Sequence, residues 1–190
     1  MTDQLLHHIQ KLLPGVTIPG EQIAHFFEII AVKKDTVLLS EGEPCKNIYF
    51  VNKGCLYLFY DYNDQKEVIH FALENWWLTD YKTFSDGKPA VYAIAAMEDS
   101  EITRISRANY EAMLLQFPFM ALYFNKIHER AYGAALYKQK TYATTSKQDF
   151  YNYFRRTYPV LIQRIPDDIF ASYIGVSAEI LKELQANYLS

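Results

Sequence analysis

The segment 171–184 has the residue types and the spacing of a helix-turn-helix. Ala171 is small enough to let two helices cross closely, and Gly175 can adopt the left-handed conformation that a tight turn requires. Ser177 is a favourable N-cap for a second helix. The inward face of that helix is expected to consist of Ile180, Leu181 and Leu184. The pattern predicts a DNA-reading unit, with an ordinary helical hairpin as the alternative.

Polar side chains on the second helix predict contacts with bases, because the second helix of such a unit enters the major groove. A carboxylate accepts a hydrogen bond from cytosine, and an amide side chain pairs with adenine. The residues expected to contact DNA are Ser177, Glu179, Lys182 and Gln185 on the helix, with Arg155, Arg156 and Arg164 on phosphates. Residues 147–190 carry five basic and five acidic side chains, so counterion release would contribute little to the affinity.

Metal and redox chemistry are the enzymatic alternatives. A metal-dependent oxygenase needs several histidines and an acid aimed into a barrel, whereas His70 is the only histidine of the strand-rich region. An iron–sulfur cluster needs about four thiolates, and the chain has Cys45 and Cys55. These two cysteines leave a redox pair open, although two buried, unreactive thiols are the simpler interpretation. We expect no catalytic residues, no metal site and no enzymatic activity.

The elements that carry these residues follow from the hydrophobic pattern, which changes twice along the chain. Amphipathic spacing predicts helices over 2–13 and 21–31. A period of two, interrupted by turn residues, then predicts an antiparallel sandwich or barrel. Its expected strands cover 35–40, 46–51, 55–60, 66–73, 91–97 and 101–106. Helical spacing returns afterwards over 107–116, 119–144, 146–158, 166–174 and 177–189.

The predicted helix 119–144 is long enough for seven turns and contains no proline. One set of its residues follows the 4-3 spacing of a coiled-coil seam: Met120, Phe124, Ile127, Ala131, Ala134, Lys138 and Thr141. The two alanines would allow a second helix to approach closely. We therefore expect a homodimer, with packing of this helix on its own β-domain as the alternative.

Composition excludes several classes of protein. The chain has 190 residues, of which 50% are hydrophobic, 22% charged and 16% aromatic, so intrinsic disorder is excluded. No apolar run reaches the roughly 18–20 residues that span a bilayer, and the N-terminus has no signal-peptide pattern. With two cysteines, a reducing cytoplasm is the expected location. Residues 1–117 carry 10 basic and 16 acidic side chains, against 9 and 6 in residues 118–190, so the second part is the better candidate for binding a polyanion.

Three segments carry a resemblance to the Crp/Fnr family of transcription regulators, which extends over about residues 5–190. They are VLLSEGEPCKNIYFVNKGCLYLFY (37–60), MEDSEITRIS (97–106) and YPVLIQRIPDDIFASYIGVSAEIL (158–181), the last being similar to the Bacteroidetes branch. The resemblance implies an α+β fold: an antiparallel β-roll (double-stranded jelly roll) with N-terminal helices, a long dimerisation helix and a C-terminal helix-turn-helix. It implies a sensor domain over 1–117, the dimerisation helix over 118–145 and a DNA-binding domain over 146–190. Ligand in the roll would reorient the DNA-reading helices of the dimer.

The segment that holds the ligand in this family departs from the pattern of its cyclic-nucleotide binders. Those members carry a Gly-Glu pair and an arginine that pairs with the phosphate, whereas this chain has Asp80 as the only nearby acid and Ala90 at the arginine position. We expect no cyclic nucleotide as cofactor. The aromatic residues of this segment predict either a self-filled pocket or a site for an unidentified apolar or aromatic effector. The expected pocket residues are Trp76, Trp77, Thr79, Asp80, Tyr81, Lys88, Ala90, Val91 and Tyr92.

Together these features predict a dimeric regulator that binds double-stranded DNA and has a non-standard effector pocket. The alternative is a ligand-sensing or protein-interaction dimer that has lost both DNA binding and cyclic nucleotide binding. Glu183 favours this alternative, because it stands where the family usually carries arginine.

Overall fold

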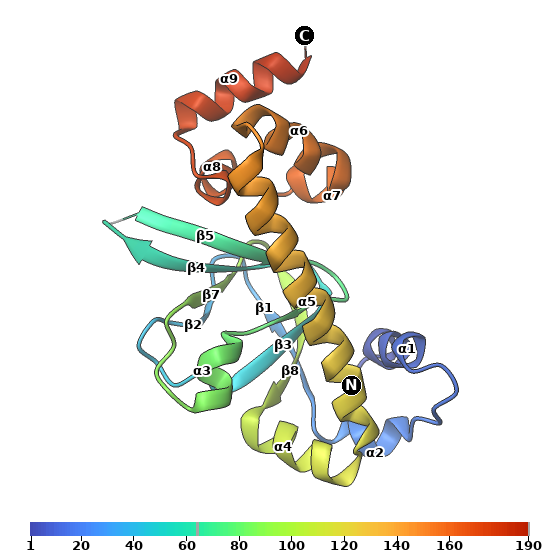
Figure 1. The fold of residues 1–190 in the computed structure, drawn as a ribbon. Helices are drawn as coiled ribbons and strands as arrows, with labels where there is room; N and C mark the ends of the chain where they lie inside the picture. The colour runs from blue at the N-terminus through green and yellow to red at the C-terminus, as the bar shows by residue number, and fades with distance from the viewer. Residues whose placement is uncertain (64, 190) are drawn as a thin grey trace. The chain divides into compact units, whose positions relative to one another are not determined.

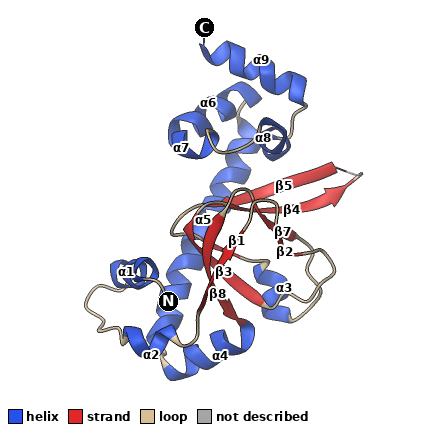
Figure 2. Ribbon diagram, turned by 180° about the vertical axis from the view of Figure 1, so that it is seen from behind, coloured by secondary structure: helices blue, strands red, loops and turns tan. Residues whose placement is uncertain are grey.

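The strand-rich part of the chain forms two sheets in the computed structural model, which describes residues 1–63 and 65–189 (Figures 1 and 2). The strands are β1 (Glu28–Val32), β2 (Val37–Leu39), β3 (Asn47–Lys53), β4 (Leu56–Tyr62), β5 (Gln65–Ala72), β6 (Trp77–Leu78), β7 (Ala93–Ala96) and β8 (Ser100–Ser106). One sheet has the order β1-β8-β3-β6 and the other β2-β7-β4-β5. Every pair whose register is described is antiparallel.

Helices precede and follow the strands along the chain, and one short helix interrupts them. They are α1 (Asp3–Leu12), α2 (Gly20–Ala24), α3 (Tyr81–Asp86), α4 (Arg107–Gln116), α5 (Phe119–Thr144), α6 (Lys147–Thr157), α7 (Pro159–Ile162), α8 (Asp167–Ile174) and α9 (Ala178–Leu189). The chain divides into two compact units. Unit 1 comprises Met1–Tyr60 and His70–Glu129, and unit 2 comprises Asp61–Ile69 and Arg130–Ser190. The strands β4 and β5 and the helix α5 therefore each pass from one unit into the other.

The core of unit 1 has two sides, which meet at β3. Phe50 packs against His8 of α1 and Trp77 of β6, whereas the adjacent Tyr49 reaches the other sheet and donates a hydrogen bond from Oη to the carbonyl of Leu38 at 3.0 Å. Successive side chains of a strand point to opposite faces, so helices cover one face of β3 and the second sheet covers the other. This explains why the strand is buried on both faces.

Aromatic side chains form the core of unit 2. Phe154 contacts the rings of Tyr158, Phe170 and Tyr173, and Tyr151 contacts Phe170. Helix α6 begins at an N-cap, Ser146, whose Oγ accepts from the amide of Asp149 at 3.1 Å. Aromatic side chains therefore contribute to both cores.

The predicted helix 21–31 is wrong in its second half. Helix α2 ends at Ala24, and residues 28–32 form β1, which pairs with β8 through partners such as Ile30 and Ile102. The apolar spacing fits a helix, but β-branched residues at 29, 30 and 32 fit a pleated strand, and a partner strand far along the chain decides between the two. The remaining predicted elements agree to within a few residues, while β6, α3 and α7 were not predicted.

Candidate functional site

The two tryptophans of the predicted effector segment lie in different surroundings. Trp77 is buried and donates a hydrogen bond from Nε1 to Tyr123 Oη at 2.8 Å, with its ring against Phe124 of α5. Trp76 is 37% exposed and its ring stacks on His70. Trp77 therefore joins the sheet to the long helix and belongs to the core, where it is not available to a ligand.

Thr79 and Asp80 are buried and fully engaged within the chain. Thr79 donates to the carbonyl of Asn47 at 2.8 Å. Asp80 is the N-cap of α3: one of its oxygens accepts from the amide of Thr83 at 3.3 Å and the other from the amide of Val91 at 3.0 Å. The carboxylate thus bridges the two ends of the loop that the sequence assigns to ligand binding.

Ala90 is held by backbone pairing, with no polar side chain directed at a ligand. Its amide donates to the carbonyl of Glu43 at 2.8 Å, and its carbonyl accepts from the amide of Gly42 at 2.8 Å. The neighbouring predicted residues are exposed or half-buried: Lys88 and Val91 are exposed, and the Tyr92 ring lies against Tyr60.

Two polar atoms are buried without a hydrogen-bond partner in the described part of the chain: Oη of Tyr81, one of the predicted pocket residues, and Nε2 of His128 on α5. Their rings meet edge to face, with centroids 4.9 Å apart. Burial raises the pKa of Tyr81 and lowers the pKa of His128, because both charged forms lose solvation. Both side chains are thus kept neutral between α3 and α5.

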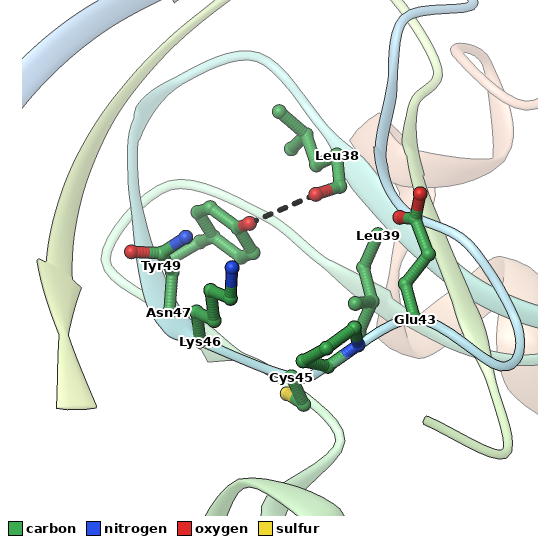
Figure 3. A pocket seen from close by; sticks show the side chains of 8 residues that line it. Leu38, Leu39, Glu43, Cys45, Lys46, Asn47 and Tyr49 are labelled. Atoms are coloured by element: carbon green, nitrogen blue, oxygen red, sulfur yellow. Dashed lines mark hydrogen bonds between the residues drawn. The ribbon is translucent and has the colours of Figure 1, made fainter. Parts of the chain in front are cut away.

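A cavity of about 260 Å³ lies beside the predicted segment rather than within it (Figure 3). Its lining comes from β2, β3 and the loop between them: Leu38, Leu39, Glu43, Pro44, Cys45, Lys46, Asn47 and Tyr49. None of the nine predicted pocket residues lines it. Cys45 lines the cavity and also contacts the predicted segment, because its Sγ lies 3.2 Å from Oγ1 of Thr79. Only the turn residues 41–44 mark this loop in the sequence, and they do not indicate a cavity.

The segment in which the sequence predicts a helix-turn-helix folds as α8, a turn and α9. Gly175 has φ 64° and ψ 52°, the left-handed conformation that ends α8. The carbonyl of Ile174 accepts from Lys147 Nζ at 2.7 Å and from Tyr142 Oη at 3.1 Å. Of the predicted inward residues, Leu181 and Leu184 are buried, but Ile180 is 44% exposed.

The residues expected to contact DNA divide into exposed and engaged groups. Lys182 and Glu179 lie on the exposed face of α9, and a hydrogen bond with Ser177 lowers the pKa of Glu179. Gln185 Nε2 donates to Asp167 at 3.0 Å. Arg155 lies over the Tyr188 ring, 4.5 Å from its centroid.

The other two arginines differ in exposure. Arg156 is exposed and donates from Nε to the carbonyl of Asn152 at 3.3 Å, whereas Arg164 is half-buried.

The predicted dimer seam on α5 is largely covered by the chain itself. Met120 and Phe124 are buried in unit 1, with Ile127 half-buried, because this face of the helix packs on the β-roll. Lys138 and Thr141 are half-buried in unit 2. Ala131 and Ala134, in the middle of the seam, are exposed.

A different face of α5 carries its exposed large side chains. Leu122 is 57% exposed, Tyr132 68% and Leu136 48%. Leu122 and Leu136 are two heptads apart, and Tyr132 lies about one helical turn before Leu136, so the free face is rotated from the predicted one. The sequence could not distinguish the two, because both faces carry apolar residues.

Comparison with known proteins finds a family model that matches the strand-rich part of the chain. Residues 29–117 match the family model of the cyclic nucleotide-binding domain. No curated protein sequence matches the chain.

Solved structures cover more of the chain. FixK2 from Bradyrhizobium japonicum has a TM-score of 0.71 and 15% identity over 85% of this chain and 83% of that chain. A protein from Eubacterium rectale assigned to the Crp/Fnr family of transcriptional regulators has a TM-score of 0.71 and 12% identity over 94% and 86%. The c-di-GMP-responsive global regulator CLP of Xanthomonas campestris has a TM-score of 0.68 and 14% identity over 89% of each chain.

The chain therefore has the cyclic nucleotide-binding β-roll fold of the Crp/Fnr regulators, as the sequence predicts. The matching family model is described as a binding domain, and the proteins from Xanthomonas campestris and Eubacterium rectale are described as regulators. Among the described residues, no helix has the length and apolar character needed to cross a membrane. In the same residues, no three His, Cys, Asp or Glu side chains are grouped closely enough to hold a metal ion.

Proposed function

We propose that this chain is a Crp/Fnr-type transcription regulator that binds double-stranded DNA as a homodimer. The observation that carries the proposal is the geometry of α8 and α9. Leu181 and Leu184 hold α9 on unit 2, while its opposite face, which includes Glu179 and Lys182, is exposed along the helix. A helix held on one side by a tight turn and free on the other suits insertion into the major groove.

The charges of this face indicate an affinity that depends weakly on salt. Lys182 is flanked by Glu179 and Glu183, and all three are exposed. The logarithm of the association constant falls as the logarithm of the salt concentration rises, and each phosphate neutralised by a cation makes this slope steeper by about 0.9. We propose few phosphate contacts, mainly from Arg156 and Lys182, so most discrimination would come from hydrogen bonds to bases.

The effector pocket is proposed to be non-standard and not to take cyclic nucleotide. Two features of the predicted segment support this: Asp80 is a buried acid, and Ala90, at the position where the resemblance puts the family's arginine, has only a methyl group. A phosphate buried beside a carboxylate without a guanidinium group is electrostatically unfavourable. An uncharged, partly aromatic effector fits these surroundings better.

The dimer is proposed to form through the exposed face of α5 that contains Leu122, Tyr132 and Leu136. The stretch 129–137 is exposed at every position in the single chain. A helical segment exposed on all sides, with two tyrosines and a leucine on its surface, gains stability by packing against a second copy.

Cytoplasmic location and membership of the Bacteroidetes branch stay predictions of the sequence; the reported similar structures give no support to that branch.

Fluorescence anisotropy with a labelled random-sequence duplex tests DNA binding. Non-specific binders of this kind reach dissociation constants of about 10⁻⁴–10⁻⁶ M at physiological salt and bind more tightly at about 50 mM salt. We expect micromolar binding at low salt, a weaker affinity for Lys182→Gln and a stronger one for Glu183→Gln. Absence of binding by wild type and Glu183→Gln at micromolar protein would contradict the proposal.

The acidic face of α9 favours a second candidate, a ligand-sensing or protein-interaction dimer that has lost DNA binding. In that case Glu183→Gln does not restore binding, whereas the dimer persists in sedimentation. Thermal shifts with cyclic AMP, cyclic GMP and aromatic metabolites address the effector. A rise in Tm with cyclic AMP would overturn the proposed pocket, since a ligand that binds the folded state raises its stability.

A further inference from the structure

The strand β5 lies at the end of its sheet, next to β4 only. The edge of a sheet presents backbone N–H and C=O groups that proteins cover or pair in order to avoid association with other chains. In unit 2, the outer part of β5 contacts helices α5 and α8 through three hydrogen bonds to its backbone.

Ser172 of α8 makes two of these bonds with a single hydroxyl. Its Oγ donates to the carbonyl of Lys66 at 2.6 Å and accepts from the amide of Val68 at 2.8 Å. A neighbouring strand would pair with the same kind of groups, a carbonyl and an amide two residues apart. The hydroxyl therefore takes the place of a strand partner.

Lys138 of α5 makes the third bond and also contacts α8. Its Nζ donates to the carbonyl of Ile69 at 2.6 Å and lies 3.8 Å from the centroid of the Tyr173 ring. Hydrogen bonding and a cation–π contact both hold this ammonium group. One lysine thus joins α5, β5 and the helix that precedes the turn at Gly175.

These contacts bear on α9, because Ser172 and Tyr173 lie three and two residues before Gly175. The boundary between the two units falls within both strands, at Tyr60–Asp61 in β4 and at Ile69–His70 in β5. Each strand therefore continues from unit 2 into the sheet of unit 1. A movement of the sheet that shifts the β4–β5 hairpin would be transmitted to α8, since packed elements respond as units.

We propose that Ser172 and Lys138 are positioning residues that dock the helix-turn-helix on the edge of β5, so that the β4–β5 hairpin sets the orientation of α9. The docking stands on the contacts of unit 2 alone. Its consequence for DNA rests on the proposed function.

Hydrogen exchange of the full-length protein, resolved to single amides by NMR, tests the docking. Ser172→Ala is compared with Ser85→Ala, the same change on the exposed surface of α3. We expect the Val68 amide to exchange about tenfold faster in Ser172→Ala, which corresponds to the loss of one ordinary hydrogen bond, and to be unchanged in Ser85→Ala. Equal Val68 exchange in Ser172→Ala and wild type would overturn the docking. Ser172→Thr keeps the hydroxyl, so retained protection there shows that a loss in Ser172→Ala is not general unfolding.

Anisotropy with the same duplex as above tests the consequence. If wild type and Ser85→Ala bind DNA equally and Ser172→Ala binds several-fold differently, the hairpin positions α9. Equal binding by all three would overturn that role while leaving the docking intact. If wild type binds no DNA at all, the proposed function fails, and the exchange of Val68 still decides whether the hairpin is docked.

Discussion

The carboxylate of Asp80 accepts a hydrogen bond from the backbone amide of Val91 at 3.0 Å. The same side chain caps α3 through the amide of Thr83. A loop that would otherwise present two amides to an anion is thus closed by a charge of the protein itself. This gives the segment a structural role that does not require a ligand.

Removing this charge should destabilise unit 1. In Asp80→Ala, the helix loses its N-cap and the amide of Val91 loses its partner, so the free energy of unfolding should fall by about 1–3 kcal/mol. Urea denaturation followed by tryptophan fluorescence measures this, because Trp76 and Trp77 both lie in unit 1. The control is Asp86→Ala at the exposed end of the same helix, expected within about 0.5 kcal/mol of wild type. Identical midpoints for the two variants would contradict the bridging role.

The turn at Gly175 should not tolerate a side chain. Its φ of 64° disfavours residues with a Cβ, and a Cβ there would collide with Tyr142 Oη. Gly175→Ala should lower the free energy of unfolding of unit 2 by about 1–3 kcal/mol. Gly133→Ala is the matched control: no atom lies within 4 Å of a Cβ built there, so alanine in the helix interior should stabilise by about 0.5–1 kcal/mol. Urea titrations followed by NMR signals of unit 2 distinguish these opposite signs.

The same turn shows why part of the site was predictable from sequence. Gly175 and Ser177 act through local conformation and local hydrogen bonds, so their types and spacing were sufficient to place α8 and α9. Ile180 is different, because it follows the helical spacing of the buried leucines but lies at the margin of that face. Its exposure depends on how widely the neighbouring helices cover α9.

Features set by partners far along the chain were not predictable. The strand β1 forms because it pairs in antiparallel register with β8, which begins more than 70 residues later in the chain. The free face of α5 is the one that the β-roll does not cover, and this depends on where Met120 and Phe124 pack. The roles of Asp80 and Trp77 likewise depend on Val91 and Tyr123, which the sequence does not connect to them.

The exposed face of α5 should control self-association. In Leu136→Glu, a dimer through this face would bury an unpaired carboxylate, which costs several kcal/mol, so its dissociation constant should rise by about tenfold or more. Leu115→Glu makes the same change on α4, where the leucine is 85% exposed. Sedimentation velocity should show a shift toward monomer for Leu136→Glu, whereas Leu115→Glu should sediment as a dimer like wild type. Unchanged sedimentation of both variants would place the dimer interface elsewhere.

The stability of unit 2 should rise between about pH 8 and 9.5 because of Lys138. Burial lowers the pKa of this ammonium from 10.5 to about 8, so at pH 9 the side chain is mostly neutral in the folded protein and protonated in the unfolded chain. Unfolding then takes up a proton, and raising the pH makes it less favourable, by about 1–2 kcal/mol over this range. Above pH 10 the buried Tyr173 opposes the effect, because burial raises its pKa and the unfolded chain loses the phenolic proton first.

Urea titrations at several pH values, followed by methyl signals of Ile174 and Leu181, measure this rise. Lys138→Met should remove it, since no group with a lowered pKa is then left at the contact between α5, β5 and Tyr173. Lys140→Met changes an exposed lysine two residues further along the same helix and should keep it. A rise that is equal in both variants would mean that another group titrates, and the buried state of the Lys138 ammonium beside Ile69 would then be wrong.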